Sequence, residues 1–78
     1  MPRVGTAKKH VYELLTGMQQ GERFRSRDLC DEVSEKCGYD VSPHTIGYIL
    51  GLFEQENILE REEVLNASNY WVVVRPAI

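Results

Sequence analysis

The sequence predicts a small α+β domain in which three amphipathic helices are followed by a two-stranded β-hairpin. Apolar residues recur at helical spacing in three segments before residue 56. After it, the β-branched and aromatic segments ILEREEVL and YWVVV flank the turn-forming tetrapeptide NASN. A chain of 78 residues is the size of one compact domain. We therefore expect a single domain over residues 1–78, with residues 1–6 as a flexible N-terminal arm.

The first helix is predicted over residues 7 to about 19. Thr6 is its expected N-cap, and Gly21 is its expected stop. Four residues at i, i+3, i+4 and i+7 form its apolar face: Val11, Leu14, Leu15 and Met18. The segment ERFR follows, and its single apolar residue, Phe24, fits a short third strand.

The second and third helices have clear start and stop signals. Ser26 is the expected N-cap of the second helix, and Gly38 its left-handed stop. The third helix begins with Ser42 as N-cap and Pro43 at the first helical position, and Asn57 ends it. Four residues form its predicted buried side: Ile46, Ile49, Leu50 and Phe53.

The hairpin is predicted over about residues 58–75. Alternation along its second strand places Tyr70 and Trp71 on opposite faces, so one of the two aromatic rings is expected to be exposed.

The composition is that of an ordinary globular domain, with 42% hydrophobic and 27% charged residues. No apolar run reaches the roughly 20 residues that span a bilayer, so we expect no membrane partner and a cytoplasmic location. The net charge of −3 is uneven. Residues 1–27 contain six Lys and Arg against two Asp and Glu, whereas residues 28–78 contain three against ten. Such a chain binds nucleic acid only through one oriented basic face.

The segment VSPHTIGYILGLFEQENILER, residues 41–61, resembles the helix-turn-helix of bacterial and archaeal winged-helix transcription regulators. The positions that match the family pattern are Val41, Ser42, Thr45, Ile46, Leu50, Phe53, Asn57, Ile58, Leu59 and Arg61. The order of elements agrees from about residue 7 to 75. The resemblance implies a winged helix-turn-helix fold with the hairpin as wing, binding to double-stranded DNA, and a role as transcription regulator or accessory factor.

The outward face of the third helix departs from the family, because it carries no arginine or lysine, and neither does the wing turn at residues 66–69. Arg25 and Arg27 flank the positive end of the second helix, which suits phosphate contacts. Gly47 and Gly51 each cost about 1 kcal/mol relative to alanine inside a helix, which suggests close approach either of DNA or of a helix of a partner protein. The expected DNA-binding residues are Arg25, Ser26, Arg27, His44, Thr45, Gly47, Tyr48 and Gln55.

The alternative function is a protein–protein docking module that does not touch DNA. The acidic second helix and wing would then form the interaction surface, with Tyr48, Leu52 and Trp71 as interface candidates. A homodimer or another protein partner is a further expectation, because one short reading helix rarely gives enough affinity.

Cysteine and histidine positions argue against a metal site. Cys30 and Cys37 are separated by about 10 Å along one predicted helix, too far for a disulfide. With His44 they recur every seven residues, unlike the tight spacing of zinc ligands. No catalytic constellation or phosphate-binding glycine loop is evident. We expect no metal, no cofactor, no small-molecule ligand and no enzymatic activity.

Overall fold

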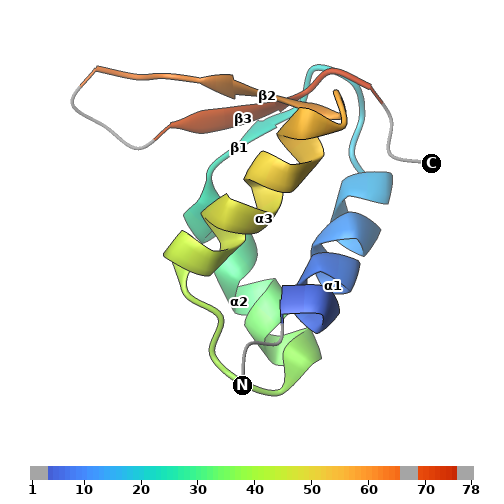
Figure 1. The fold of residues 1–78 in the computed structure, drawn as a ribbon, viewed down its shortest axis with the longest axis vertical. Coiled ribbons are helices and arrows are strands. Elements are labelled where there is room, and N and C mark those ends of the chain that lie inside the picture. The colour runs from blue at the N-terminus through green and yellow to red at the C-terminus, as the bar shows by residue number, and fades with distance from the viewer. Residues whose placement is uncertain (1–3, 66–68, 76–78) are drawn as a thin grey trace.

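The computed structural model describes residues 4–65 and 69–75 and has the predicted α+β fold, consistent with a small winged-helix-like arrangement (Figure 1). Its elements in chain order are α1 (Val4–Thr16), β1 (Arg23–Phe24), α2 (Ser26–Cys37), α3 (Pro43–Gln55), β2 (Leu59–Glu62) and β3 (Tyr70–Val73). The three helices pack against one another, with α3 crossing in front of α2 in this view, and the sheet lies across one end of them (Figure 1). The hairpin β2–β3 extends beyond α3 as the wing.

The sheet is antiparallel with strand order β1-β3-β2, so the short strand expected near Phe24 is confirmed. Phe24 is opposite Trp71, and Arg61 is opposite the same Trp71 from the other side. The two hairpin strands lie within the predicted range of 58–75. Apart from Asn69, the predicted turn at residues 66–69 lies outside the described residues.

The core lies between the helices and the inner face of the sheet. The predicted buried side of α3 is confirmed, with Ile46, Ile49 and Leu50 wholly inaccessible to solvent. The predicted face of α1 is confirmed for Val11 and Leu15, which are buried, and Leu14, which is partly buried, whereas the partly buried Met18 lies beyond the end of the helix. From β3, Trp71 and Val73 point into this core, and among the described residues no polar or charged residue is buried.

Helix α1 begins and ends about three residues earlier than predicted. Residues 4–6 belong to the helix, so the arm prediction is wrong for them, and Thr6 is not its N-cap. The Gly17 N–H donates to the Leu14 carbonyl, which ends the helix well before Gly21. Gly21 instead has φ +90° in the turn before β1, where its N–H donates to Val73. Gly21 is therefore a left-handed residue of this turn and not the residue that ends the helix.

Helix α2 also begins differently from the prediction. Arg25, and not Ser26, occupies the N-cap position, and its backbone N–H donates to Asp28 Oδ2 at 2.8 Å. Ser26 is therefore the first helical residue. The Asp28 carboxylate thus accepts the N–H of the cap residue, and the Asp28 N–H donates to the Arg25 carbonyl, so the helix start is bonded without a serine side chain at the cap. Gly38, at φ +80°, ends the helix as predicted.

The start of α3 is confirmed in detail. Ser42 Oγ accepts the Thr45 N–H at 3.2 Å, and Pro43 opens the helix. Asn57 has a φ of 64° and ends the segment in the left-handed conformation, as predicted. Among the described residues, no helix is long and apolar enough to cross a membrane.

Candidate nucleic-acid interface

An open groove of about 830 Å³ lies where the start of α2, the exposed side of α3 and the wing meet. Its lining comes from all three elements: Arg25, Ser26, Arg27, Pro43, His44, Gly47, Tyr48, Arg61, Asn69 and Trp71. Residues far apart in the sequence therefore share one concave surface. We call this surface the arginine groove.

The arginine groove brings together six of the eight residues that the sequence predicted for DNA binding. Thr45 and Gln55 are outside its lining. Thr45 is half-buried with its hydroxyl 3.1 Å from the Ser42 hydroxyl, so it takes part in capping α3. Gln55 is exposed on the last turn of α3.

Arg25 is attached to the wing by an aromatic contact. Its guanidinium carbon lies 4.5 Å from the centroid of the Tyr70 ring, and that of Arg23 lies 4.6 Å from the same ring. Arg23 also pairs with Glu62 of β2. The Glu62 carboxylate thus neutralises the charge of Arg23. Arg25 has no ion-pair partner among the described residues, and the Tyr70 ring holds its guanidinium in place.

Arg61 was not among the expected site residues, and the structure places it in the groove. Its guanidinium carbon lies 4.9 Å from the Trp71 ring centroid, and its Nη2 atom lies 3.4 Å from Glu54 Oε1. Its register opposite Trp71 turns the side chain toward α3. Arg61 could have been predicted as a groove residue from the pairing register of the hairpin, but the sequence alone does not give that register.

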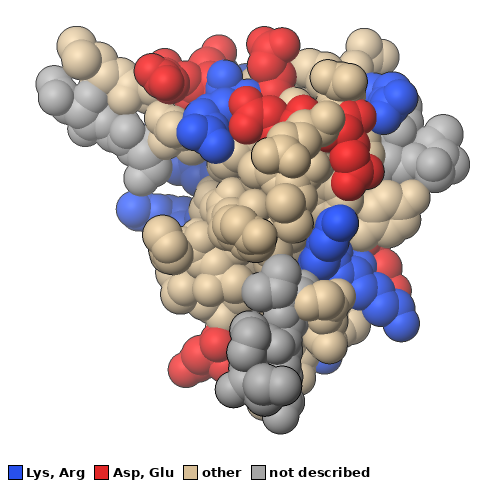
Figure 2. All heavy atoms as spheres, in the orientation of Figure 1, with Lys and Arg blue, Asp and Glu red and all other residues tan. Residues whose placement is uncertain are grey.

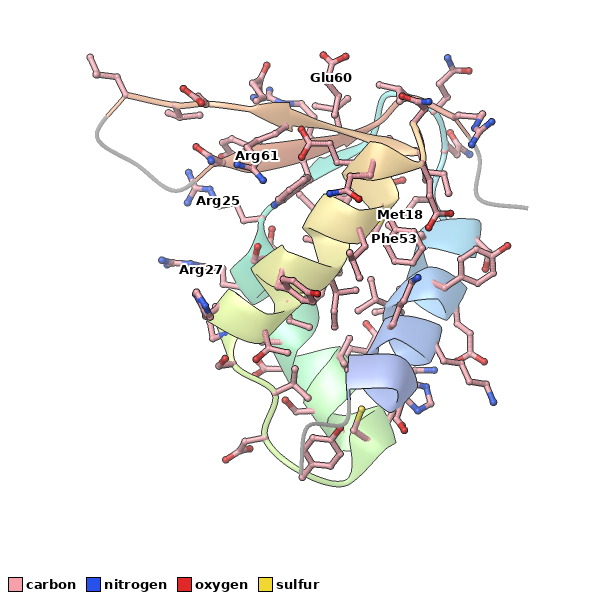
Figure 3. All side chains as sticks on the ribbon, viewed as in Figure 1. Met18, Arg25, Arg27, Phe53, Glu60 and Arg61 are labelled. Carbon is pink, nitrogen blue, oxygen red and sulfur yellow. The ribbon has the colours of Figure 1, made fainter. Side chains whose placement is uncertain are left out.

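The charge of the groove is of one sign. Its lining contains three arginines and no aspartate or glutamate. Among the ion pairs of residues 4–65 and 69–75, none includes Arg25 or Arg27. In Figure 3, Arg25 and Arg27 project on the same side, below the wing, whereas Glu60 points away from the helices. Carboxylates and cations elsewhere on this face lie intermixed (Figure 2).

The helix glycines are not required by packing within the chain. A Cβ atom at Gly47 would lie 3.5 Å from Ser26 Oγ, and one at Gly51 would lie 3.9 Å from Arg61 Nη2. Both are ordinary contact distances, and both backbones are helical. The fold would accept alanine at either position.

The three candidates for protein docking differ in exposure. Tyr48 is 60% exposed, and Leu52 is half-buried. Trp71 is an interface candidate only if its ring faces outward, and it is 4% exposed, so this candidate is excluded. Strand pairing with Phe24 and Arg61 fixes Trp71 on the inner face of the sheet, and Tyr70 takes the outer face.

Both cysteines are free thiols and half-buried. Burial raises the pKa of the Cys30 thiol, and the neighbouring Asp31 adds to the increase, while Arg27 opposes it. The Cys30 Sγ lies 3.5 Å from the Ser26 carbonyl. In the part of the chain that the structure describes, no three His, Cys, Asp or Glu side chains gather as metal ligands.

Comparison with protein-family models, curated proteins and solved structures gave no match to this chain.

Proposed function

We propose that this protein binds double-stranded DNA through the arginine groove and the adjoining face of α3, as a transcription regulator or accessory factor. One observation supports this most: in a chain of net charge −3, the lining of this groove contains three arginines and no carboxylate. Neutralising phosphates supplies most of the affinity of a nucleic-acid-binding surface. The positive charge of this groove therefore matters more for DNA binding than the net charge of the chain.

Each part of the groove has a role in this proposal. Arg25 and Arg27 donate to phosphate oxygens, and guanidinium groups suit that geometry because they present paired N–H donors. Ser26 adds a hydroxyl at the positive end of α2. His44, Gly47 and Tyr48 on α3 then face the bases or the sugar-phosphate backbone. A second copy on the same duplex would lengthen the recognised site.

An NMR titration of the labelled protein with a mixed-sequence duplex tests the proposal, at low salt and again near physiological salt. Amide shifts should concentrate at residues 25–28 and 43–51 and should shrink as salt rises, because counterion release drives phosphate binding. Absence of shifts at low salt would overturn the proposal.

A pair of matched variants separates groove contacts from total charge. Arg27→Gln and Lys9→Gln each remove one exposed cation, but Arg27 lines the groove and Lys9 is on α1. Arg27→Gln should reduce the slope of log affinity against log salt by about 1, and Lys9→Gln should leave it nearly unchanged. Equal effects of the two variants would mean that DNA does not occupy the groove.

Protein docking is the second candidate function, and the exposure of Tyr48 favours it. A tyrosine that is 60% exposed beside half-buried Leu52 is a suitable anchor for a partner surface. A docking module would show no duplex binding at low salt, and Tyr48→Ala would abolish its association with the partner while Arg27→Gln would not.

A further inference from the structure

We propose that Glu54 is a built-in competitor of DNA phosphate for Arg61. In the free protein the Glu54 carboxylate is paired with the guanidinium of Arg61. When DNA binds, a phosphate of its backbone replaces that carboxylate. The inference rests on the proposed function of the arginine groove. It assigns Arg61 as a phosphate contact and Glu54 as the residue that limits its affinity.

The geometry permits this exchange. The Arg61 Nη2 lies 3.4 Å from Glu54 Oε1, at the long end for a hydrogen bond, and the side chains are 43% and 38% exposed. An incoming phosphate can therefore reach the guanidinium without any unfolding. Carboxylate and phosphate oxygens are alternative acceptors for the same N–H donors.

Trp71 keeps Arg61 in position during the exchange. The guanidinium carbon lies 4.9 Å from the centroid of the indole ring, and the ring itself is buried and fixed by strand pairing. Contact with an aromatic face does not use the N–H donors at the edge of the guanidinium. The donors thus remain available to whichever anion is bound, and the arginine need not be reordered.

The competition has a bounded size. An exposed pair of this kind shifts an equilibrium by roughly 1.5- to 5-fold, so releasing Arg61 from Glu54 should tighten DNA binding by about that factor. Removing any carboxylate near the site also reduces general repulsion, so a matched control is needed. Glu60 provides it, because it precedes Arg61 on β2, is exposed, and is in no ion pair within the described residues.

The test measures duplex affinity for Glu54→Gln and Glu60→Gln, each in the wild-type and in the Arg61→Gln background. Glu54→Gln should tighten binding about 1.5- to 5-fold more than Glu60→Gln in the wild-type background, and no more than Glu60→Gln when Arg61 is absent. In the Glu54→Gln background, Arg61→Gln should lower the salt slope by about 1. Unchanged circular dichroism melting would show that each variant is folded.

Two failures can be told apart. A wild-type protein that does not bind the duplex at low salt overturns the proposed function, and this inference with it. A wild-type protein that binds, with equal effects of Glu54→Gln and Glu60→Gln, overturns the competition alone. An excess effect of Glu54→Gln that persists in the Arg61→Gln background also overturns it, because Glu54 would then act without Arg61.

Discussion

The Arg25 guanidinium lies against the ring of Tyr70, with its carbon 4.5 Å from the ring centroid. This contact joins the residue that caps α2 to the wing strand β3, and Arg23 contacts the same ring. The Tyr70 ring therefore adds a side-chain contact to the pairing of β1 with β3 that already joins the α2 start to the wing.

Tyr70→Leu should weaken both the fold and the binding of DNA. Each cation–π contact at an exposed site is worth about 0.5–1 kcal/mol, so loss of two should lower the free energy of unfolding by about 1–2 kcal/mol. Arg25 also loses its support, so duplex affinity should fall. Tyr70→Phe keeps the ring and should behave as the wild type in urea denaturation and in DNA titration. If Tyr70→Leu binds DNA as tightly as Tyr70→Phe, Arg25 does not need the stack.

Ser34 connects α2 to the segment before α3. Its Oγ accepts the Val41 N–H at 2.8 Å, in a partly buried place. Ser34→Ala would leave that N–H without its acceptor, and we expect a loss of about 1 kcal/mol in the free energy of unfolding, measured by urea denaturation. Thr6→Ala, at an exposed position of α1, is the control and should not destabilise. A Ser34→Ala midpoint equal to that of the control would contradict this account.

Helix α3 shows how much of the fold was predictable from sequence. Its cap at Ser42, its buried residues and its end at Asn57 follow from local rules, and all were found where predicted. The boundaries of α1 and the cap of α2 were not, because Gly21 and Ser26 each fit two local roles. For Gly21 a contact distant in sequence, its N–H with Val73, decides the role, and for Ser26 the deciding contact is the one between the Arg25 N–H and Asp28.

The candidate site was only partly predictable. Arg25, Arg27 and the α3 residues were found through helix ends and helix faces, which are local properties. Arg61 and the burial of Trp71 depend on the pairing register of β2, β3 and β1. Alternation alone gives two opposite faces but not which face the helices cover, so it does not decide whether Tyr70 or Trp71 faces outward.

The thiol of Cys30 should react slowly at neutral pH. The thiolate is the reactive form, and burial raises the pKa of this thiol above its ordinary value of 9.0. In a Cys37→Ser variant, the iodoacetamide rate should rise with a midpoint above pH 9.0 in the folded protein and return to the ordinary midpoint in urea. The folded state favours the neutral thiol, so stability from this group is complete below that pH and is lost as the pH rises through the folded pKa. Equal midpoints in the folded and unfolded protein would show that burial has no such effect.

Gly47 and Gly51 allow stability and binding to be separated. Alanine is favoured over glycine in a helix interior by about 1 kcal/mol, and a Cβ atom at either position meets only ordinary contacts. Both Gly47→Ala and Gly51→Ala should therefore raise the free energy of unfolding by about that amount in urea denaturation. A lower stability in either variant would show that the helix packs more tightly at that position.

DNA binding should distinguish the same two variants. Gly47 lines the arginine groove, whereas Gly51 lies outside its lining and a Cβ atom there would make only an ordinary 3.9 Å contact with Arg61 Nη2. The methyl group at position 47 is therefore the one that would intrude between α3 and a bound duplex. Crowding of a close contact costs roughly 1–3 kcal/mol, so Gly47→Ala should bind about fivefold more weakly or worse, while Gly51→Ala keeps wild-type affinity. If both variants bind as the wild type does, α3 does not approach DNA closely at Gly47. The affinity would then come from the arginines of α2 and the wing, and His44 and Tyr48 would not be in contact with the bases.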